Sequence, residues 1–138
     1  WVSTNYAVLA CTEFPTCLND AWMPATSSDW RAGFTIWREL GTASTTALTA
    51  IHLTHRAMAL VVLLVITGLI LQLKKYPELR QLKIWLMVLL TLQILTGISN
   101  VVFSWPLFAA VMHTGGAAAL VLVLTRIWTE SNTTKIHP

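Results

Sequence analysis

The sequence predicts an all-α membrane protein, an antiparallel bundle of three complete transmembrane helices and the end of a fourth. Of its 138 residues, 55% are hydrophobic and only 11% are charged, whereas soluble domains carry about 25% charged residues. Long apolar runs cover residues 51–73, 84–103 and 107–128. A helix of about 20 apolar residues crosses the hydrocarbon layer, so each run is long enough to span it. The chain is too short for a second hydrophobic core, so residues 1–138 are expected to form one membrane domain.

The segment before the first complete span has two parts. Residues 1–10 are apolar but too short to cross a bilayer, which predicts the end of a transmembrane helix that begins upstream in a longer protein. Residues 11–50 are rich in turn-forming and polar side chains, which is typical of a loop. In this loop the spacing of Trp30, Phe34 and Trp37 favours a short amphipathic helix at the membrane surface. An ordered loop with buried aromatic side chains is the alternative.

Two cysteines lie in this loop, Cys11 and Cys17, with Pro15 between them. A tight turn at the proline would bring the two sulfur atoms together. A disulfide would fit an oxidising compartment, whereas two free thiols would fit a reducing one. The topology of the chain favours the disulfide, because it places the loop outside the cytoplasm.

The basic residues predict that topology. Six of the nine lysines and arginines lie within residues 74–83 or at and beyond Arg126. The positive-inside rule places both regions in the cytoplasm, together with the polar tail 129–138. The cysteine loop then lies outside. The sequence contains neither a basic stripe nor a phosphate-binding loop, so membrane lipid is an expected partner and nucleic acid is not.

Three histidines lie inside the apolar runs, and two of them, His55 and His113, are the main functional signal, because ionisable groups cost free energy in a bilayer. His55 lies about 6 Å below the outer end of its helix, and His113 about 10 Å below Pro106. The two helices run in the same direction, since one span separates them, so both imidazoles reach a similar depth. Two neutral imidazoles at one depth can supply both axial ligands of a haem iron, whereas zinc would require more ligands. A lone intramembrane histidine is often only a hydrogen-bonding group between helices.

Residues beside these histidines each have more than one interpretation. Arg56 could pair with a haem propionate or extend to the lipid headgroups. His52, one turn before His55, could contact a propionate, orient the site or ligate the iron itself. Gly116, next to His113 along the helix face, could leave room for a flat macrocycle or let two helices approach closely.

One face of the middle span carries polar and small side chains, spaced at helical intervals. They are Gln93, Thr96, Gly97, Asn100 and Ser104. This face could turn toward a cofactor site, although hydrogen bonds between helices would explain it equally well.

Four stretches resemble, in order, the carboxy-terminal half of the haem A synthase family: WVSTNYAVLACTEFPTC, HLTHRAMAL, QILTGISNVV and MHTGGAAALV. The resemblance covers the chain to about Trp128. Its specific parts are the pair His55–Arg56 and the later His113. That family consists of eight-span membrane enzymes with two similar four-helix halves, so the resemblance implies that this chain is one half. It also implies that the cysteine pair forms a disulfide.

The resemblance further implies an oxidoreductase, which oxidises a methyl group of haem O to the formyl group of haem A for terminal oxidases. A haem b would be held by His55 and His113 in this half and would handle electrons, while the substrate haem O would sit in the absent half. The fragment alone would be inactive, and no catalytic residue is assigned in it. Implied partners are haem O, haem A, the upstream half, haem O synthase and terminal oxidase assembly factors.

The implied location is a bacterial inner membrane. Two other functions fit the same residues. One is an electron-transfer cytochrome b subunit without chemistry of its own, and the other is a non-catalytic haem-binding assembly module.

Overall fold

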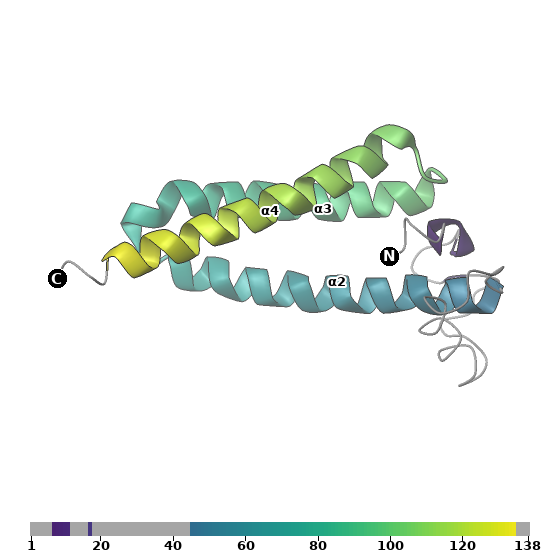
Figure 1. Ribbon diagram of the computed structural model, residues 1–138, viewed down its shortest axis with the longest axis horizontal. Helices are drawn as coiled ribbons and strands as arrows, with labels where there is room; N and C mark the ends of the chain where they lie inside the picture. Colours follow the sequence, from purple (N-terminus) through teal and green to yellow (C-terminus); the bar gives the residue numbers. More distant parts are fainter. Residues whose placement is uncertain (1–6, 12–16, 18–44, 135–138) are drawn as a thin grey trace. The chain divides into compact units, whose positions relative to one another are not determined.

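The computed structural model describes residues 7–11, 17 and 45–134, and every regular element among them is helical. Figure 1 shows the elements in chain order. They are the 3-10 helices η1 (Ala7–Ala10) and η2 (Pro77–Leu79) and the α-helices α2 (Thr45–Leu73), α3 (Arg80–Val102) and α4 (Leu107–Thr134). The predicted all-α membrane fold is confirmed.

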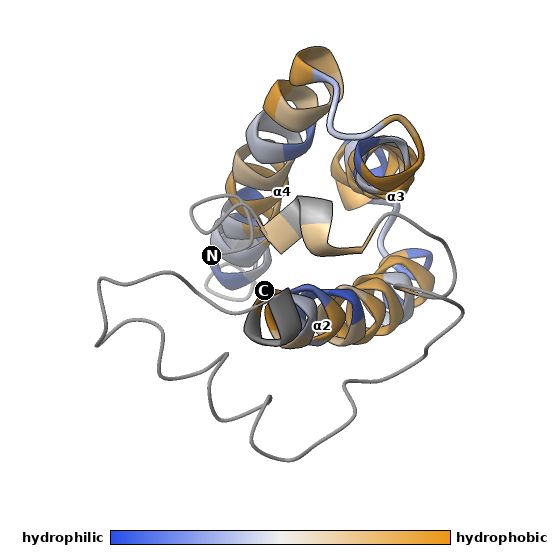
Figure 2. Ribbon diagram, turned by 90° about the vertical axis from the view of Figure 1, so that its right-hand side faces the viewer, coloured by the Kyte–Doolittle hydropathy of each residue, from blue (hydrophilic) through white to orange (hydrophobic). Residues whose placement is uncertain are grey.

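Among the described residues, three segments are long and apolar enough to cross a membrane, and each contains most of one long helix. They are Leu48–Leu73, Pro77–Val102 and Leu107–Thr133. Figure 2 shows the same property on the ribbon, because most of each long helix carries hydrophobic colours. Their side chains agree with a lipid environment: Leu64, Val65 and Leu122, for example, are each at least 65% exposed.

The helices extend beyond the predicted spans. Helix α2 begins at Thr45 instead of residue 51, and α4 continues to Thr134 instead of residue 128. Hydropathy marks only the part of a helix that lies in hydrocarbon, whereas backbone hydrogen bonds continue into the polar ends. At the end of α4, Arg126 Nε donates to Glu130 Oε1 across one helical turn at 2.7 Å. The predicted amphipathic helix with Trp30, Phe34 and Trp37 lies outside the described residues.

The chain divides into two compact units. The first contains Trp1–Val61 and Ile98–Pro106, and the second contains Val62–Gly97 and Leu107–Pro138.

The second unit has an apolar core to which all three long helices contribute. Its buried members are Ile66, Ile70, Leu73, Leu79, Leu86, Leu120 and Ile127. The α2 members follow a spacing of four and three residues, which places them on one face of that helix. In lipid this core is stabilised by close van der Waals packing between helices, because removal of apolar surface from water contributes little.

In the first unit, helix α3 ends in a left-handed turn. Ser104 and Trp105 have φ values of 53° and 65°. The N–H of Trp105 donates to Asn100 O at 2.8 Å, and that of Ser104 donates to Val101 O at 3.3 Å. This is the Schellman pattern, in which the left-handed residue is usually glycine. Both residues therefore adopt a backbone conformation that costs free energy, because their Cβ atoms are crowded at positive φ.

Replacing Ser104 with glycine is expected to raise the free energy of unfolding by about 1 kcal/mol, because glycine adopts positive φ without a Cβ clash. The measurement is thermal or denaturant unfolding of the protein in detergent. Ser99→Gly is the matched control, since Ser99 lies inside the helical part of α3. There glycine should instead lower stability by about 0.5 kcal/mol. A loss of stability in both variants would contradict the prediction.

Candidate functional site

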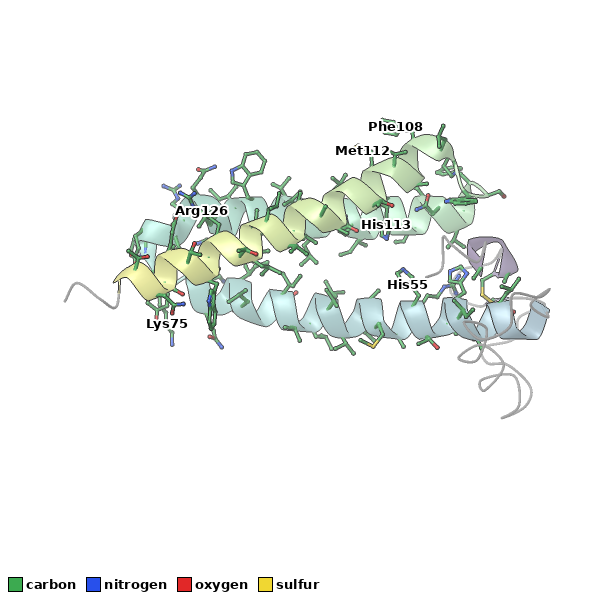
Figure 3. The ribbon with its side chains drawn as sticks, in the orientation of Figure 1. His55, Lys75, Phe108, Met112, His113 and Arg126 are labelled. Atoms are coloured by element: carbon green, nitrogen blue, oxygen red, sulfur yellow. A yellow bond between two sulfur atoms is a disulfide. The ribbon has the colours of Figure 1, made fainter. Side chains whose placement is uncertain are left out.

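His113 lies on α4, six residues after the helix begins, and its side chain is half-buried in the second unit (Figure 3). Its Nδ1 lies 3.0 Å from Oγ1 of Thr96, which is a buried residue of α3. One ring nitrogen is thereby occupied within the protein. Ligation of a metal by this imidazole would therefore use Nε2.

Two further residues of α3 hold this part of α4. Gln93 Nε2 donates a hydrogen bond to the backbone carbonyl of His113 at 2.9 Å. Gly97 lies directly beside the imidazole, because a Cβ built on it would be 3.2 Å from Cε1 of His113. The polar face of α3 thus makes hydrogen bonds between helices, and these bonds converge on one histidine.

Gly116 packs against the side chain of Gln93 on α3. A Cβ built on Gly116 would overlap Nε2 of Gln93, whereas one built on Gly115 would meet nothing within 4 Å. Of the two interpretations of Gly116, the structure supports the close approach of helices. Contact between Gly116 and a macrocycle stays a prediction.

Asn100 extends the polar face into the first unit. Its side chain is 8% exposed, and its Oδ1 has no hydrogen-bond partner in the described part of the chain. A buried oxygen without a donor costs about 1–3 kcal/mol. A bound group that offers a hydrogen-bond donor would recover that free energy, so this oxygen fits the neighbourhood of a ligand.

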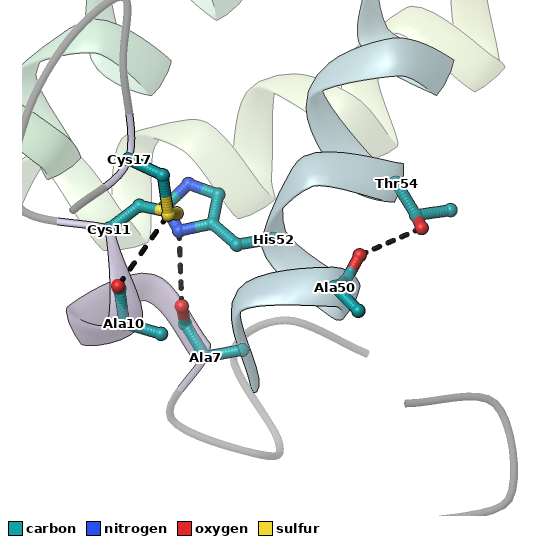
Figure 4. The surroundings of a disulfide bond; sticks show 7 residues. All are labelled: Ala7, Ala10, Cys11, Cys17, Ala50, His52 and Thr54. Carbon is teal, nitrogen blue, oxygen red and sulfur yellow. Dashed lines mark hydrogen bonds between the residues drawn. A yellow bond between two sulfur atoms is a disulfide. The ribbon is translucent and has the colours of Figure 1, made fainter. Parts of the chain in front are cut away.

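In the first unit, His52 is buried and joins α2 to η1. Its Nδ1–H donates to the carbonyl oxygen of Ala7 at 3.0 Å (Figure 4). In the same unit Cys11 and Cys17 form a disulfide, and both are almost fully buried. His52 is therefore an anchor for the segment that carries the disulfide. A role of His52 as an iron ligand, an orienting group or a propionate contact stays a prediction.

His55 follows one turn later on α2 with an exposed side chain, and Arg56 beside it is half-buried. His55 belongs to the first unit and His113 to the second. It stays a prediction that the two rings lie at one depth and share one iron. A contact between Arg56 and a propionate also stays a prediction.

The donor chemistry of these residues fits a haem. Within the described ranges, no three histidine, cysteine or acidic side chains gather into a metal site. A haem iron needs no such cluster, because the porphyrin supplies four nitrogen ligands and the protein adds at most two. An imidazole fixed at Nδ1 by a second residue is the usual form of a protein metal ligand.

Comparison with known proteins shows which protein family this chain resembles. A model of the cytochrome oxidase assembly protein family matches residues 1–125. The haem A synthase of Shewanella oneidensis is 38% identical over 97% of this chain and 43% of its own length. The haem A synthase of Halalkalibacterium halodurans is 33% identical over 82% of this chain and 33% of its own length. The chain thus spans less than half the length of either relative, and no solved structure matches it significantly.

Proposed function

Since this chain belongs to the cytochrome oxidase assembly protein family that includes the haem A synthases, we propose that it is the carboxy-terminal, haem-b-binding half of a haem A synthase. The complete protein oxidises a methyl group of haem O to the formyl group of haem A. That change removes four electrons from one carbon atom. A haem b in this half supplies one-electron transfer when it is bound.

In this proposal the residues of the chain hold and orient that haem. His113 and His55 would hold the haem iron, each through one neutral imidazole nitrogen. Nε2 of Gln93 holds the backbone of His113 by donating a hydrogen bond to the carbonyl oxygen of that residue. Arg56 pairs with a propionate, which is a charge-assisted contact.

The observation that carries the proposal is the environment of His113. An imidazole lies within an apolar span, and a neighbouring helix fixes both its ring and its backbone. Hydrogen bonding between helices alone needs neither the imidazole nor its orientation, because Gln93 by itself joins the two helices. The family to which the chain belongs supplies the haem chemistry.

The proposed location is a bacterial inner membrane, and both relatives are bacterial proteins. The connection between α2 and α3 is expected in the cytoplasm, because it carries Lys74, Lys75 and Arg80 with exposed side chains. The disulfide is then outside, where oxidising conditions maintain it. The proposed partners are membrane lipid, haem O, haem A, the upstream half, haem O synthase and assembly factors of terminal oxidases.

Pigment analysis tests the proposed activity. The complete protein that contains this chain is produced in a host that makes haem O but no haem A, and the extracted haems are separated by chromatography. The expected result is conversion of haem O to haem A, with none in the host alone. If haem O is left unchanged while a low-spin haem b is present, the proposed activity is refuted in favour of an electron-transfer cytochrome.

A further inference from the structure

We propose that Thr96 is a positioning residue that sets the tautomer of His113, so that the haem-ligating Nε2 carries the lone pair. The inference rests on the proposed function, because it assigns a role toward the haem that His113 would hold. It concerns a residue that does not itself touch the iron. All the contacts involved lie within the second unit.

The single hydroxyl hydrogen of Thr96 is already used within α3. Oγ1 donates to Leu92 O at 2.7 Å, and the carbonyl oxygen of Gln93 lies 3.4 Å away. Carbonyl oxygens only accept hydrogen bonds, and a threonine hydroxyl has only one hydrogen to give. Toward His113, Oγ1 therefore presents a lone pair.

The direction of the bond between the two residues follows. Because Oγ1 accepts, Nδ1 of His113 must carry a hydrogen and donate it across the 3.0 Å contact. In a neutral imidazole with a hydrogen on Nδ1, the lone pair lies on Nε2. That nitrogen is then the metal ligand, and no rearrangement of hydrogens is needed when a haem binds.

The surroundings make this bond rigid. Thr96 is 8% exposed, so water competes weakly for its hydroxyl group. The bond from Gln93 holds the backbone of His113, and Gly97 allows the ring to lie against α3. His113 is thus restrained at Nδ1 of its ring and at its backbone carbonyl group, and its ring lies close to the backbone of α3 at Gly97.

The bond has a chemical consequence for a bound iron. A hydrogen bond from Nδ1–H to a fixed acceptor raises the basicity of the imidazole as a ligand. A more basic ligand favours the ferric over the ferrous state. Loss of the acceptor should therefore raise the midpoint potential of the haem and weaken its retention.

The experiment compares three variants of the complete protein in detergent. Thr96→Val keeps the shape and removes the acceptor, and Thr96→Ser keeps the hydroxyl group. Thr91→Val is the matched control, because Thr91 makes the same bond to Met87 O on α3 at 3.0 Å and is exposed. The readouts are the midpoint potential and the rate of haem transfer to an apo-globin. Thr96→Val should raise the potential and weaken haem binding by about tenfold, whereas the other two variants should match the wild type.

A second readout needs no bound haem. The nitrogen chemical shifts of 15N-labelled histidine, measured on the haem-depleted protein, distinguish the two tautomers. We expect a hydrogen on Nδ1 of His113 in the wild type, and a mixture of tautomers in Thr96→Val. This measurement stays informative if the valine variant fails to retain haem.

The outcomes separate this inference from the proposed function. A wild-type His113 with its hydrogen on Nε2, or a valine variant whose tautomer and potential match the wild type, overturns the role of Thr96 and leaves haem binding intact. Conversely, a His113→Ala variant that keeps the full haem spectrum removes the proposed ligand, whatever its tautomer.

Discussion

Replacement of His113 with glycine is expected to abolish the six-coordinate low-spin haem spectrum of the complete protein, and added imidazole is expected to restore it. The glycine removes one axial ligand and leaves space for a free imidazole at the same position. The measurement is a reduced-minus-oxidised difference spectrum in membranes. His55→Gly should behave in the same way, because each ligand is required for six-coordination.

His52 offers a matched control for this experiment. In His52→Asn the side-chain amide can still donate to the carbonyl oxygen of Ala7, as Nδ1–H of His52 does at 3.0 Å, but the second ring nitrogen is gone. The low-spin spectrum should therefore persist. If the low-spin spectrum is lost in His52→Asn and retained in His55→Gly, the iron ligand is His52 and not His55. A spectrum retained in His113→Gly would refute the proposed haem site.

Replacement of Gly116 with leucine is expected to lower the free energy of unfolding by about 3 kcal/mol. A side chain at this position must displace the amide group of Gln93, which occupies the space where a Cβ would lie. About 1 kcal/mol comes from the lost hydrogen bond to His113 O. The rest comes from overpacking between α3 and α4, which typically costs 1–3 kcal/mol.

Gly115→Leu is the control for this prediction, since a Cβ at Gly115 meets nothing within 4 Å. The two variants share the same change in helix propensity and differ only in the face of α4 that they alter. The measurement is unfolding in detergent of both variants against the wild type. Equal effects in the pair would show that Gly116 is not a packing position. Gly116→Ala should show a smaller loss, because the end of the Gln93 side chain can move aside.

The spans and the polar face of α3 illustrate how much local pattern can predict. The three spans follow from apolar runs, because each residue contributes separately to the cost of transfer into lipid. The ends of the helices cannot be predicted from these runs. Helix α2 begins at Thr45, because backbone hydrogen bonds continue past the apolar run. The grouping of Gln93, Thr96 and Gly97 also follows from helical spacing.

The sequence by itself therefore determined the membrane class, the three long apolar helices and the presence of histidines inside two of them. Only the tertiary structure decided that Thr96 and Gln93 act on His113, and that Gly116 accommodates the side chain of Gln93. These contacts depend on the register of α3 against α4. That register arises from packing between residues about twenty positions apart, which no local periodicity records.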